Sequence, residues 1–422
     1  QKIETVALKE IDKEKLYDFL REMEFNRLLS QVISHYGESI EKKIVKHNNS
    51  IKFDLKKYQT ILKIKKQLSN ITKYEAGISK LANIKKVIKL SSNEGAFGPS
   101  LKTLKTFKKF NNQIFRYPDP EVNKLRNAIS KRYKLNKNNI ICGNGSDEIL
   151  ATIARIFSGP GDEILFSEYG FLMYPIVTQL AGAKGIKIKD VKHKNCLRNF
   201  FKAITKKTKI IYIANPNNPT GTYLTKKELN EFYKNLPKKI ILVIDAAYAE
   251  YVDKEDYTPG DDLVKNNSNV IMTRTFSKIY GLAGLRIGWA FCSNEIANIY
   301  NRVRLPFNIN SAALEASVAA LKDREFTSKS AKHNKFYLNW LTQKIIKLGL
   351  IPVPSVANFL LVRFSKIGKF SAKNVYNYLL SKGIILRTVE NYGLKNYLRI
   401  SIGKKEELVK LLEFLKIYFK TK

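Results

Sequence analysis

Short apolar runs rich in isoleucine and valine alternate with helical patterns along most of this chain of 422 residues. Six of these runs are predicted strands, at 140–142, 163–166, 209–214, 240–245, 269–273 and 286–291. Helical periodicity occurs at 121–133, 147–157, 226–235 and 330–348. Strands that alternate with helices favour a mostly parallel sheet covered by helices. The sequence therefore predicts an α/β fold.

The pattern changes toward each end of the chain. Near the C-terminus we expect a second α/β unit, with strands at 358–364 and 397–402, a helix at 374–382 and a last helix from Lys405. Near the N-terminus, residues 12–29 have the apolar spacing of an amphipathic helical segment, and a Lys- and Asn-rich stretch follows. The expected domains are an extra helical segment (1–68), an arm that joins the small domain (69–115), a large domain (116–315) and a small domain (316–422).

Composition narrows the class of protein. We expect no membrane span, because no run of about 18 apolar residues occurs, and no leader peptide, because no basic-then-apolar start is present. The three cysteines are widely spaced without a CxxC pair, and the four histidines lack the spacing of metal ligands. This pattern indicates reduced thiols in a cytoplasmic protein, and no metal site.

The net charge of +38 allows two interpretations. A nucleic-acid partner would explain it, but the lysines are spread over the whole chain, without an Arg-rich tract or a basic stripe between aromatic residues. We favour a lysine-biased composition without a specific nucleic-acid partner. In either case a positive field attracts anionic small molecules such as phosphate esters.

Four polar motifs follow predicted strands and point to one site. They are the glycine-rich turn 143–148, the Asn- and Pro-rich loop 215–222, the pair Asp245 and Tyr248, and the segment 273–288. The first turn opens a helix, so its backbone N–H groups suit a phosphate, although Ser-Asp-Glu is also an ordinary helix start. Asp245 ends an apolar strand, where a carboxylate is costly unless a cation such as a protonated ring nitrogen pairs with it.

The segment 273–288 carries the strongest chemical signal. Lys278 stands beside small hydroxyl residues at the end of an apolar run, and Arg286 follows eight positions later behind glycines. A buried lysine amine shifts toward its neutral form, which Schiff-base chemistry requires. An arginine suits a phosphate. The segment therefore favours an enzyme that holds an aldehyde cofactor covalently and binds the phosphate of that cofactor.

In this order, the motifs resemble those of the class I and II aminotransferases, which bind pyridoxal 5′-phosphate (PLP). The resemblance covers residues from about 71 to the C-terminus. It implies the fold called type I among PLP-dependent transferases, with a mostly parallel seven-stranded sheet in the large domain and a smaller α/β domain.

The resemblance also implies roles for individual residues around the cofactor ring. Lys278 would hold the cofactor covalently and carry the proton that moves during the reaction. Asp245 would pair with the ring nitrogen and keep the ring an electron sink. Tyr248 and Asn218 would bond the 3′-oxygen of the ring, and Phe171 would stack on the ring face.

Further contacts implied by the resemblance lie at the cofactor phosphate and at the substrate. The residues expected to hold the phosphate are Gly145, Ser146, Thr275, Ser277 and Arg286. Tyr117 would reach the phosphate in a neighbouring subunit, which implies a homodimer. Arg399 would bind the substrate carboxylate, because its planar fork suits that group.

Segments 72–77, 89–94, 116–119, 383–387 and 392–394 resemble the histidinol-phosphate aminotransferase subfamily. There Arg387 would join Arg399 in binding the substrate phosphate, and Tyr74 would approach the substrate. The implied reaction, a step of histidine biosynthesis, exchanges L-histidinol phosphate and 2-oxoglutarate for imidazole-acetol phosphate and glutamate. Gly95 and Ala96 stand where the subfamily more often has Asn-Pro, so we expect a less constrained loop there and leave substrate preference open.

Three alternatives remain at this point. Aromatic amino acid aminotransferases and threonine-phosphate decarboxylases share the single motifs. A PLP-binding transcription regulator would also fit a basic chain, but no helix-turn-helix pattern precedes the aminotransferase-like part, and the substrate arginines are retained.

The N-terminal segment has a resemblance of its own. Residues of about 10–40 weakly resemble the connector between the nuclease domains of bacterial DNA polymerase I. We expect a joined segment that contributes nothing to catalysis. The alternative is a lineage-specific helical arm that packs on the dimer.

Overall fold

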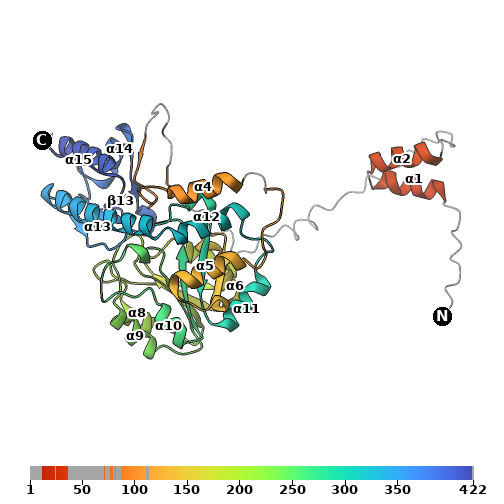
Figure 1. Cartoon of the computed structure of the whole chain (residues 1–422), viewed down its shortest axis with the longest axis horizontal. Helices are drawn as coiled ribbons and strands as arrows, with labels where there is room; N and C mark the ends of the chain where they lie inside the picture. Colours follow the sequence, from red (N-terminus) through yellow and green to blue (C-terminus); the bar gives the residue numbers. More distant parts are fainter. Residues whose placement is uncertain are drawn as a thin grey trace. The chain divides into compact units, whose positions relative to one another are not determined.

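The computed structural model describes residues 12–23, 25–36, 71, 77–78, 81, 87–110 and 114–420. The chain divides into two compact units, Gln1–Lys63 and Ile64–Lys422. Figure 1 shows the helices and strands of each unit. The predicted Tyr74 lies outside the described residues.

The first unit contains a pair of helices, α1 (Lys13–Glu22) and α2 (Asn26–Tyr36). The predicted helical segment over 12–29 thus contains all of α1 and the beginning of α2, with a turn between them. The N–H of Met23 bonds to the carbonyl of Phe19 (3.0 Å), and the N–H of Phe25 bonds to that of Leu20 (2.9 Å), which ends α1. A single straight helix would leave its apolar stripe without a partner, whereas a turn lets two amphipathic helices contact each other.

A seven-stranded sheet forms the centre of the second unit. Its order is β2 (Ile140–Gly143), β8 (Gly288–Phe291), β7 (Val270–Thr275), β6 (Ile241–Asp245), β5 (Thr208–Ala214), β3 (Glu163–Ser167) and β4 (Lys184–Ile188). Only β8 runs antiparallel to its neighbours in this sheet. The mostly parallel seven-stranded sheet is thus confirmed. Its inner strands are apolar runs because both faces are buried.

The sequence analysis did not predict the edge strand β4. Its sequence places exposed Lys184 and Lys187 among apolar residues, and only Ile188 is buried. An edge strand pairs on one side only, and lysines on it discourage pairing with another chain. The weak apolar signal of β4 is a consequence of that position.

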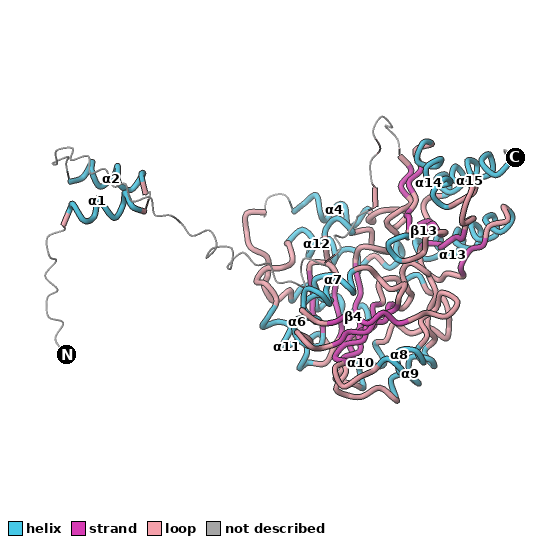
Figure 2. The backbone as a smooth tube through the Cα atoms, turned by 180° about the vertical axis from the view of Figure 1, so that it is seen from behind, coloured by secondary structure: helices cyan, strands magenta, loops and turns pink. Residues whose placement is uncertain are grey.

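Two groups of helices cover the two faces of this sheet (Figure 2). One group packs with Ile210 and Tyr212 of β5 and contains α6 (Ser146–Phe157), α7 (Met173–Ala181) and α11 (Asn294–Val303). The other packs with Ile211 and Ile213 and contains α5 (Asn123–Tyr133), α8 (Leu197–Ala203), α9 (Lys226–Lys234), α10 (Asp261–Asn266) and α12 (Ser311–Lys322). Helix α4 (Leu101–Lys109) packs on α12. Alternate β5 side chains thus enter opposite cores, as the period of a strand requires.

A second, antiparallel sheet lies nearer the C-terminus. Its order is β12 (Arg387–Thr388), β13 (Tyr397–Ser401), β10 (Phe359–Arg363) and β9 (Ile351–Val353). Three helices share a core with it: α13 (Arg324–Lys347), α14 (Ala372–Ser381) and α15 (Lys405–Lys420). Helix α13 begins six residues before the predicted 330, where the Asp323 side chain caps it.

A short parallel pair joins the expected arm to this region. Strand β1 (Ile88–Lys89) pairs with β11 (Ile384–Ile385), so the segment after residue 87 runs beside the C-terminal sheet. The arm was expected to form part of the small domain, and this pairing agrees with that expectation. The exact domain boundaries stay a prediction.

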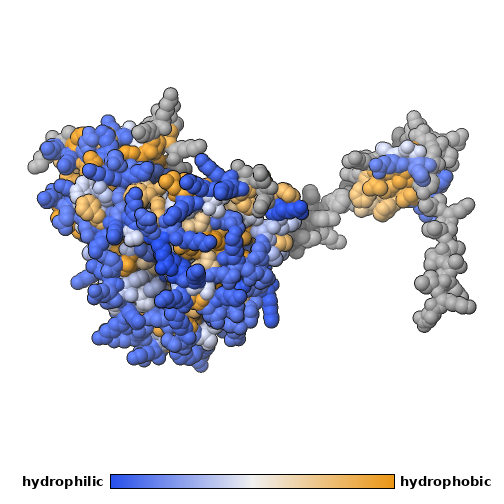
Figure 3. All heavy atoms as spheres, in the orientation of Figure 1, coloured by the Kyte–Doolittle hydropathy of each residue, from blue (hydrophilic) through white to orange (hydrophobic). Residues whose placement is uncertain are grey.

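Hydrophilic side chains cover most of the visible face of Ile64–Lys422 (Figure 3). Among the described helices, none combines the length and apolarity needed to cross a membrane.

Candidate active site

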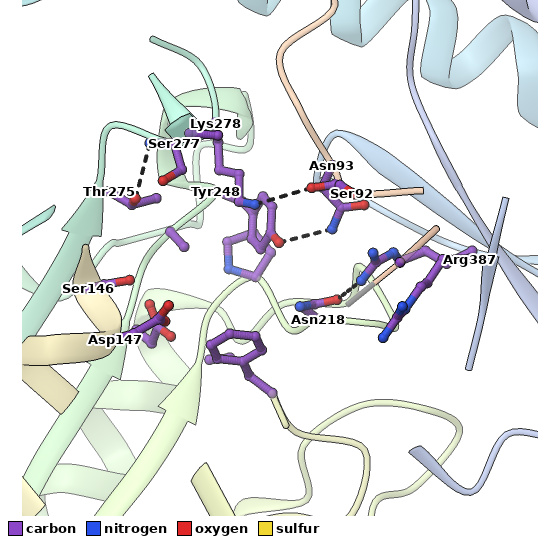
Figure 4. Close-up of a pocket in the computed structure, with 18 of the residues that line it drawn as sticks. Ser92, Asn93, Ser146, Asp147, Asn218, Tyr248, Thr275, Ser277, Lys278 and Arg387 are labelled. Atoms are coloured by element: carbon purple, nitrogen blue, oxygen red, sulfur yellow. Dashed lines mark hydrogen bonds between the residues drawn. The ribbon is translucent and has the colours of Figure 1, made fainter. Parts of the chain in front are cut away.

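One cavity collects side chains from the carboxyl ends of the parallel strands and from β12 and β13 (Figure 4). Ligands of open α/β sheets bind at this edge. The predicted residues that line the cavity are Ser146, Phe171, Asn218, Asp245, Tyr248, Thr275, Ser277, Lys278, Arg286, Arg387 and Arg399. The structure therefore brings together residues that are up to 253 positions apart (146 to 399).

Two other predicted residues do not line this cavity. Gly145 adjoins it, because a Cβ at this position would lie 2.5 Å from Nη2 of Arg286. Tyr117 is 81% exposed and stacks on Phe307 with 4.6 Å between ring centroids. Its expected role in a neighbouring subunit stays a prediction.

Lys278 follows β7 and extends into the cavity. Its Nζ donates to the carbonyl of Ser92 at 3.4 Å. Burial, and next the charge of Arg399, lower the pKa of Lys278 to about 8. A substantial fraction of this amine is therefore neutral near physiological pH, as a nucleophile toward an aldehyde must be.

Asp245 stands at the end of β6 and is 5% exposed. It accepts hydrogen bonds from the hydroxyls of Tyr174 and Thr273, each at 3.0 Å. Burial raises the pKa of this carboxyl to about 6. The two side chains that bond it are neutral, so a ligand that brings a cationic nitrogen would remove the cost of its charge. A protonated pyridine ring fits this requirement.

The N-terminus of α6 forms an anion-binding corner beside Arg286. Gly145 precedes the helix with a φ of 80° and without a side-chain cap, and a Cβ there would collide with the guanidinium of Arg286. Arg286 also bonds to the carboxylate of Asp147 (3.2 Å) and the carbonyl of Ala283 (3.1 Å). Backbone N–H groups, the helix dipole and a guanidinium together suit a phosphate. The hydroxyls of Ser146, Thr275 and Ser277 line the same cavity.

The residues expected around the ring lie between this corner and the arginines. Asn218 Oδ1 accepts a hydrogen bond from Arg399, which leaves the amide N–H groups of Asn218 as donors toward other partners. The Tyr248 oxygen accepts from Asn93 Nδ2 at 3.0 Å. Phe171 meets Tyr174 edge to face at 5.9 Å. These contacts fit a flat ring with an oxygen substituent.

Arg387 and Arg399 occupy directly opposite positions of the antiparallel strands β12 and β13. They are 8% and 5% exposed, and both line the cavity. Arg399 Nη2 donates to the carbonyl of Ser91 at 2.8 Å, whereas its buried Nε has no hydrogen-bond partner among the residues that the structure describes. Like charges opposite each other destabilise a sheet, so this pair favours a ligand with a strong negative charge.

The cavity also contains residues that were not predicted to act there. Four of them line it directly, namely Ser92, Asn93, Asp147 and Tyr392. A fifth, Tyr174, donates a hydrogen bond to Asp245. Ser92 and Asn93 belong to the segment 89–94 that carried part of the subfamily resemblance, which was the available signal. Their partners are too far away in sequence to be found by local patterns.

The loop after Asn93 is more tightly packed than we expected from its glycine and alanine. A Cβ at Gly95 would lie 2.7 Å from the carbonyl oxygen of Lys278, and one at Gly281 would lie 2.2 Å from the backbone of Gly98. The glycines therefore allow this loop to pack closely against the segment that carries Lys278.

Among the described residues, no group of three or more His, Cys, Asp or Glu side chains could hold a metal ion.

Residues 85–415 match the family model described as aminotransferase class I and II. The chain belongs to this family. Histidinol-phosphate aminotransferases of Paramagnetospirillum magneticum and Pelagibacter ubique are each 45% identical to this aminotransferase. The alignments cover 81% and 85% of its chain, and 94% and 99% of theirs. The subfamily resemblance is thereby confirmed.

Solved structures agree with the fold of this aminotransferase. A histidinol-phosphate aminotransferase from Sinorhizobium meliloti, in complex with pyridoxal-5′-phosphate, matches with a TM-score of 0.75 and 27% identity over 80% of this chain and 92% of that one. Aspartate aminotransferase of Thermus thermophilus matches with a TM-score of 0.69 and 21% identity over 79% and 91%. The type I fold of PLP-dependent transferases is confirmed.

Proposed function

We propose that this enzyme transfers an amino group between L-histidinol phosphate and 2-oxoglutarate, giving imidazole-acetol phosphate and glutamate in histidine biosynthesis. The observation that carries the proposal is the pair of opposed arginines, Arg387 and Arg399, in the same cavity as a lysine of lowered pKa. The names of the curated relatives support the choice of substrate.

PLP is the cofactor of this proposal, and it supplies an electron sink that makes the hydrogen on the substrate α-carbon acidic. Lys278 Nζ would bind the cofactor covalently and, once released from it, take and return that proton. The lowered pKa of Lys278 makes its neutral form available for both tasks. Asp245 would hold the protonated ring nitrogen. Arg286 and the N-terminus of α6 would hold the cofactor phosphate.

The two arginines would bind both substrates in turn. A phosphate in one half-reaction and a carboxylate in the other are anions that accept hydrogen bonds from a planar guanidinium. The low exposure of both side chains strengthens these bonds, because water competes less for the anion. The hydrogen bonds of Arg399 to Ser91 and Asn218 orient its guanidinium for this purpose.

A homodimer also belongs to this proposal. Apolar side chains around Tyr117 are strongly exposed, namely Ile114 (76%), Phe115 (72%) and Leu305 (71%), and a surface of this kind suits contact with a second copy. Tyr117 would then reach the cofactor phosphate of that copy.

We further propose a cytoplasmic location, which the three free cysteines support.

The test is a panel of single amino donors, read through the absorbance of the bound cofactor as it changes to its amine form. L-histidinol phosphate and glutamate should each convert the cofactor, and tyrosine or phenylalanine should convert it far more slowly. Conversion by aromatic amino acids without conversion by histidinol phosphate would indicate an aromatic aminotransferase. Release of carbon dioxide from threonine phosphate would indicate a decarboxylase.

The cofactor assignment has its own control. Lys278→Ala should remove the absorbance band of covalently held PLP, because Nζ is the atom that binds the cofactor. Persistence of that band in the variant would disprove the assignment of Lys278.

A further inference from the structure

Three consecutive residues of the segment after β1 each bond to a different residue of the cavity. These contacts are a bond from Arg399 to the carbonyl of Ser91 (2.8 Å), one from Lys278 to the carbonyl of Ser92 (3.4 Å), and one from the side chain of Asn93 to the hydroxyl of Tyr248 (3.0 Å). Figure 4 shows Ser92 and Asn93 beside Lys278 and Tyr248. The first two contacts use backbone carbonyls, whereas the third depends on which side chain is present at position 93.

The amide of Asn93 is oriented by its hydrogen bonds to Ser401 and Tyr248. The backbone N–H of Asn93 donates to Oγ of Ser401 at 2.8 Å. Oγ of Ser401 lies 3.1 Å from Oδ1 of Asn93 and donates its single proton there. Nδ2 is therefore the atom that faces Tyr248. Asn93 is 1% exposed, and Asn358 donates to its backbone carbonyl at 2.9 Å, a contact that does not involve the side-chain amide.

This orientation decides what the hydroxyl of Tyr248 can do. The phenol oxygen accepts the N–H of Asn93, and an amide nitrogen cannot accept a proton in return. The proton of Tyr248 must therefore point to another acceptor. Tyr248 lines the cavity, so an acceptor on a bound ligand is available to it. Burial raises the pKa of Tyr248, while the charge of Arg399 and the hydrogen bond from Asn93 oppose that rise.

We propose that Asn93 is a positioning residue that makes Tyr248 a hydrogen-bond donor to the 3′-oxygen of the PLP ring. The inference rests on the proposed function, because it requires PLP in this cavity. A donated hydrogen bond stabilises negative charge on that oxygen. With PLP bound to Lys278, a proton held at the nitrogen of Lys278 would then be lost more easily. Asn93 thus lowers the pH at which the covalently bound cofactor loses this proton.

The backbone at position 93 permits a clean variant. Asn93 has a φ of 54°, in the left-handed region that asparagine and glycine tolerate best. Asn93→Gly therefore removes the amide without straining the chain. Asn93→Asp keeps the size of the side chain but replaces the donor by an acceptor, which would attract the proton of Tyr248 away from the cofactor.

The experiment titrates the absorbance of the bound cofactor against pH in the full-length enzyme. Asn93→Gly should raise the titration midpoint by on the order of one pH unit, which is the size expected for one lost hydrogen bond to a charged group. Asn93→Asp should raise it at least as much. Tyr248→Phe should also raise it, and adding Asn93→Gly to Tyr248→Phe should change little more, because the partner of the amide is gone.

Asn358→Ala is the matched control. It removes the bond to the carbonyl of Asn93 but leaves the amide and Tyr248 in place, so the midpoint should stay near that of the unmodified enzyme. An unchanged midpoint in Asn93→Gly and Asn93→Asp would overturn the inference. So would an equal shift in Asn358→Ala, or a full additional shift in the Tyr248→Phe background. If the unmodified enzyme shows no pH-dependent cofactor band, the proposed function fails instead.

Discussion

At the scale of single residues, burial drives the two central ionisable groups of the cavity toward their neutral forms. The pKa of Asp245 rises to about 6, and that of Lys278 falls to about 8. A bound cofactor would remove both costs. Its ring cation would pair with the carboxylate of Asp245, and the amine of Lys278 would be used in the covalent bond. The protein without cofactor therefore keeps two groups whose charged forms are unfavourable, a common feature of binding sites.

Asp245→Asn tests this cost in the cofactor-free protein. Because the folded-state pKa of Asp245 is raised, its contribution favours folding below about pH 4 and is lost as the pH rises through about 6. We expect the variant to be more stable than the unmodified chain by ~3 kcal/mol at pH 7, and by far less at pH 4. Urea unfolding at both pH values measures this, and equal differences at the two values would contradict it.

At the scale of elements, the antiparallel pair β12–β13 positions the two arginines that we propose bind the substrate. Residues opposite each other on neighbouring antiparallel strands project from the same face. Arg387 and Arg399 therefore line the same cavity although eleven residues separate them (388 to 398). A strand of only two residues, β12, is enough to place the second arginine.

Arg387→Gln should weaken binding of the phosphorylated substrate more than binding of glutamate. A phosphate offers more oxygens and more charge to a second guanidinium than a carboxylate does, and a hydrogen bond between charged groups contributes about 1.5–3 kcal/mol. Because about 1.4 kcal/mol corresponds to a tenfold change in binding, the KM for L-histidinol phosphate should rise roughly 10- to 100-fold. Arg363→Gln, on the exposed end of β10, is the matched control and should leave both KM values unchanged. Equal increases for both substrates in Arg387→Gln would argue against the assignment.

Elements with a strong local signal could be predicted from the sequence, and contacts across the fold could not. The inner strands were found because both of their faces are apolar, whereas β4 has lysines at an edge and was missed. Asp245, Lys278 and Arg286 stand out in their own segments. The bond between Asn93 and Tyr248 joins residues 155 positions apart, and the one between Asn93 and Ser401 joins residues 308 positions apart. Such pairings depend on the topology of the sheets, which no local pattern contains.

At the scale of the whole molecule, the chain consists of a catalytic unit and a preceding helical unit. Of the residues that the structure describes, those that line the cavity lie between 77 and 399, within Ile64–Lys422. The family model begins at residue 85. The helices α1 and α2 therefore belong to a unit that the proposed chemistry does not use.

Removal of residues 1–63 should leave catalysis intact. We expect kcat/KM for L-histidinol phosphate to stay within about twofold of that of the full chain, because the core residues described for the second unit all lie after residue 87. Steady-state kinetics of both forms, with gel filtration to compare their oligomeric state, measures this. A large loss of activity with an unchanged oligomeric state would show that the N-terminal unit acts on the catalytic one, as a helical arm would.

The register of β12 and β13 has a consequence for how this enzyme can change over evolution. The side chains of a strand alternate between its faces, so a slip of one residue in this pairing would turn Arg387 away from Arg399. Insertions or deletions in the connection 389–396 are therefore tolerated only if the pairing on both sides is preserved. Loop length at this point, as well as the identity of the arginines, should separate relatives that accept a phosphorylated substrate from those that do not.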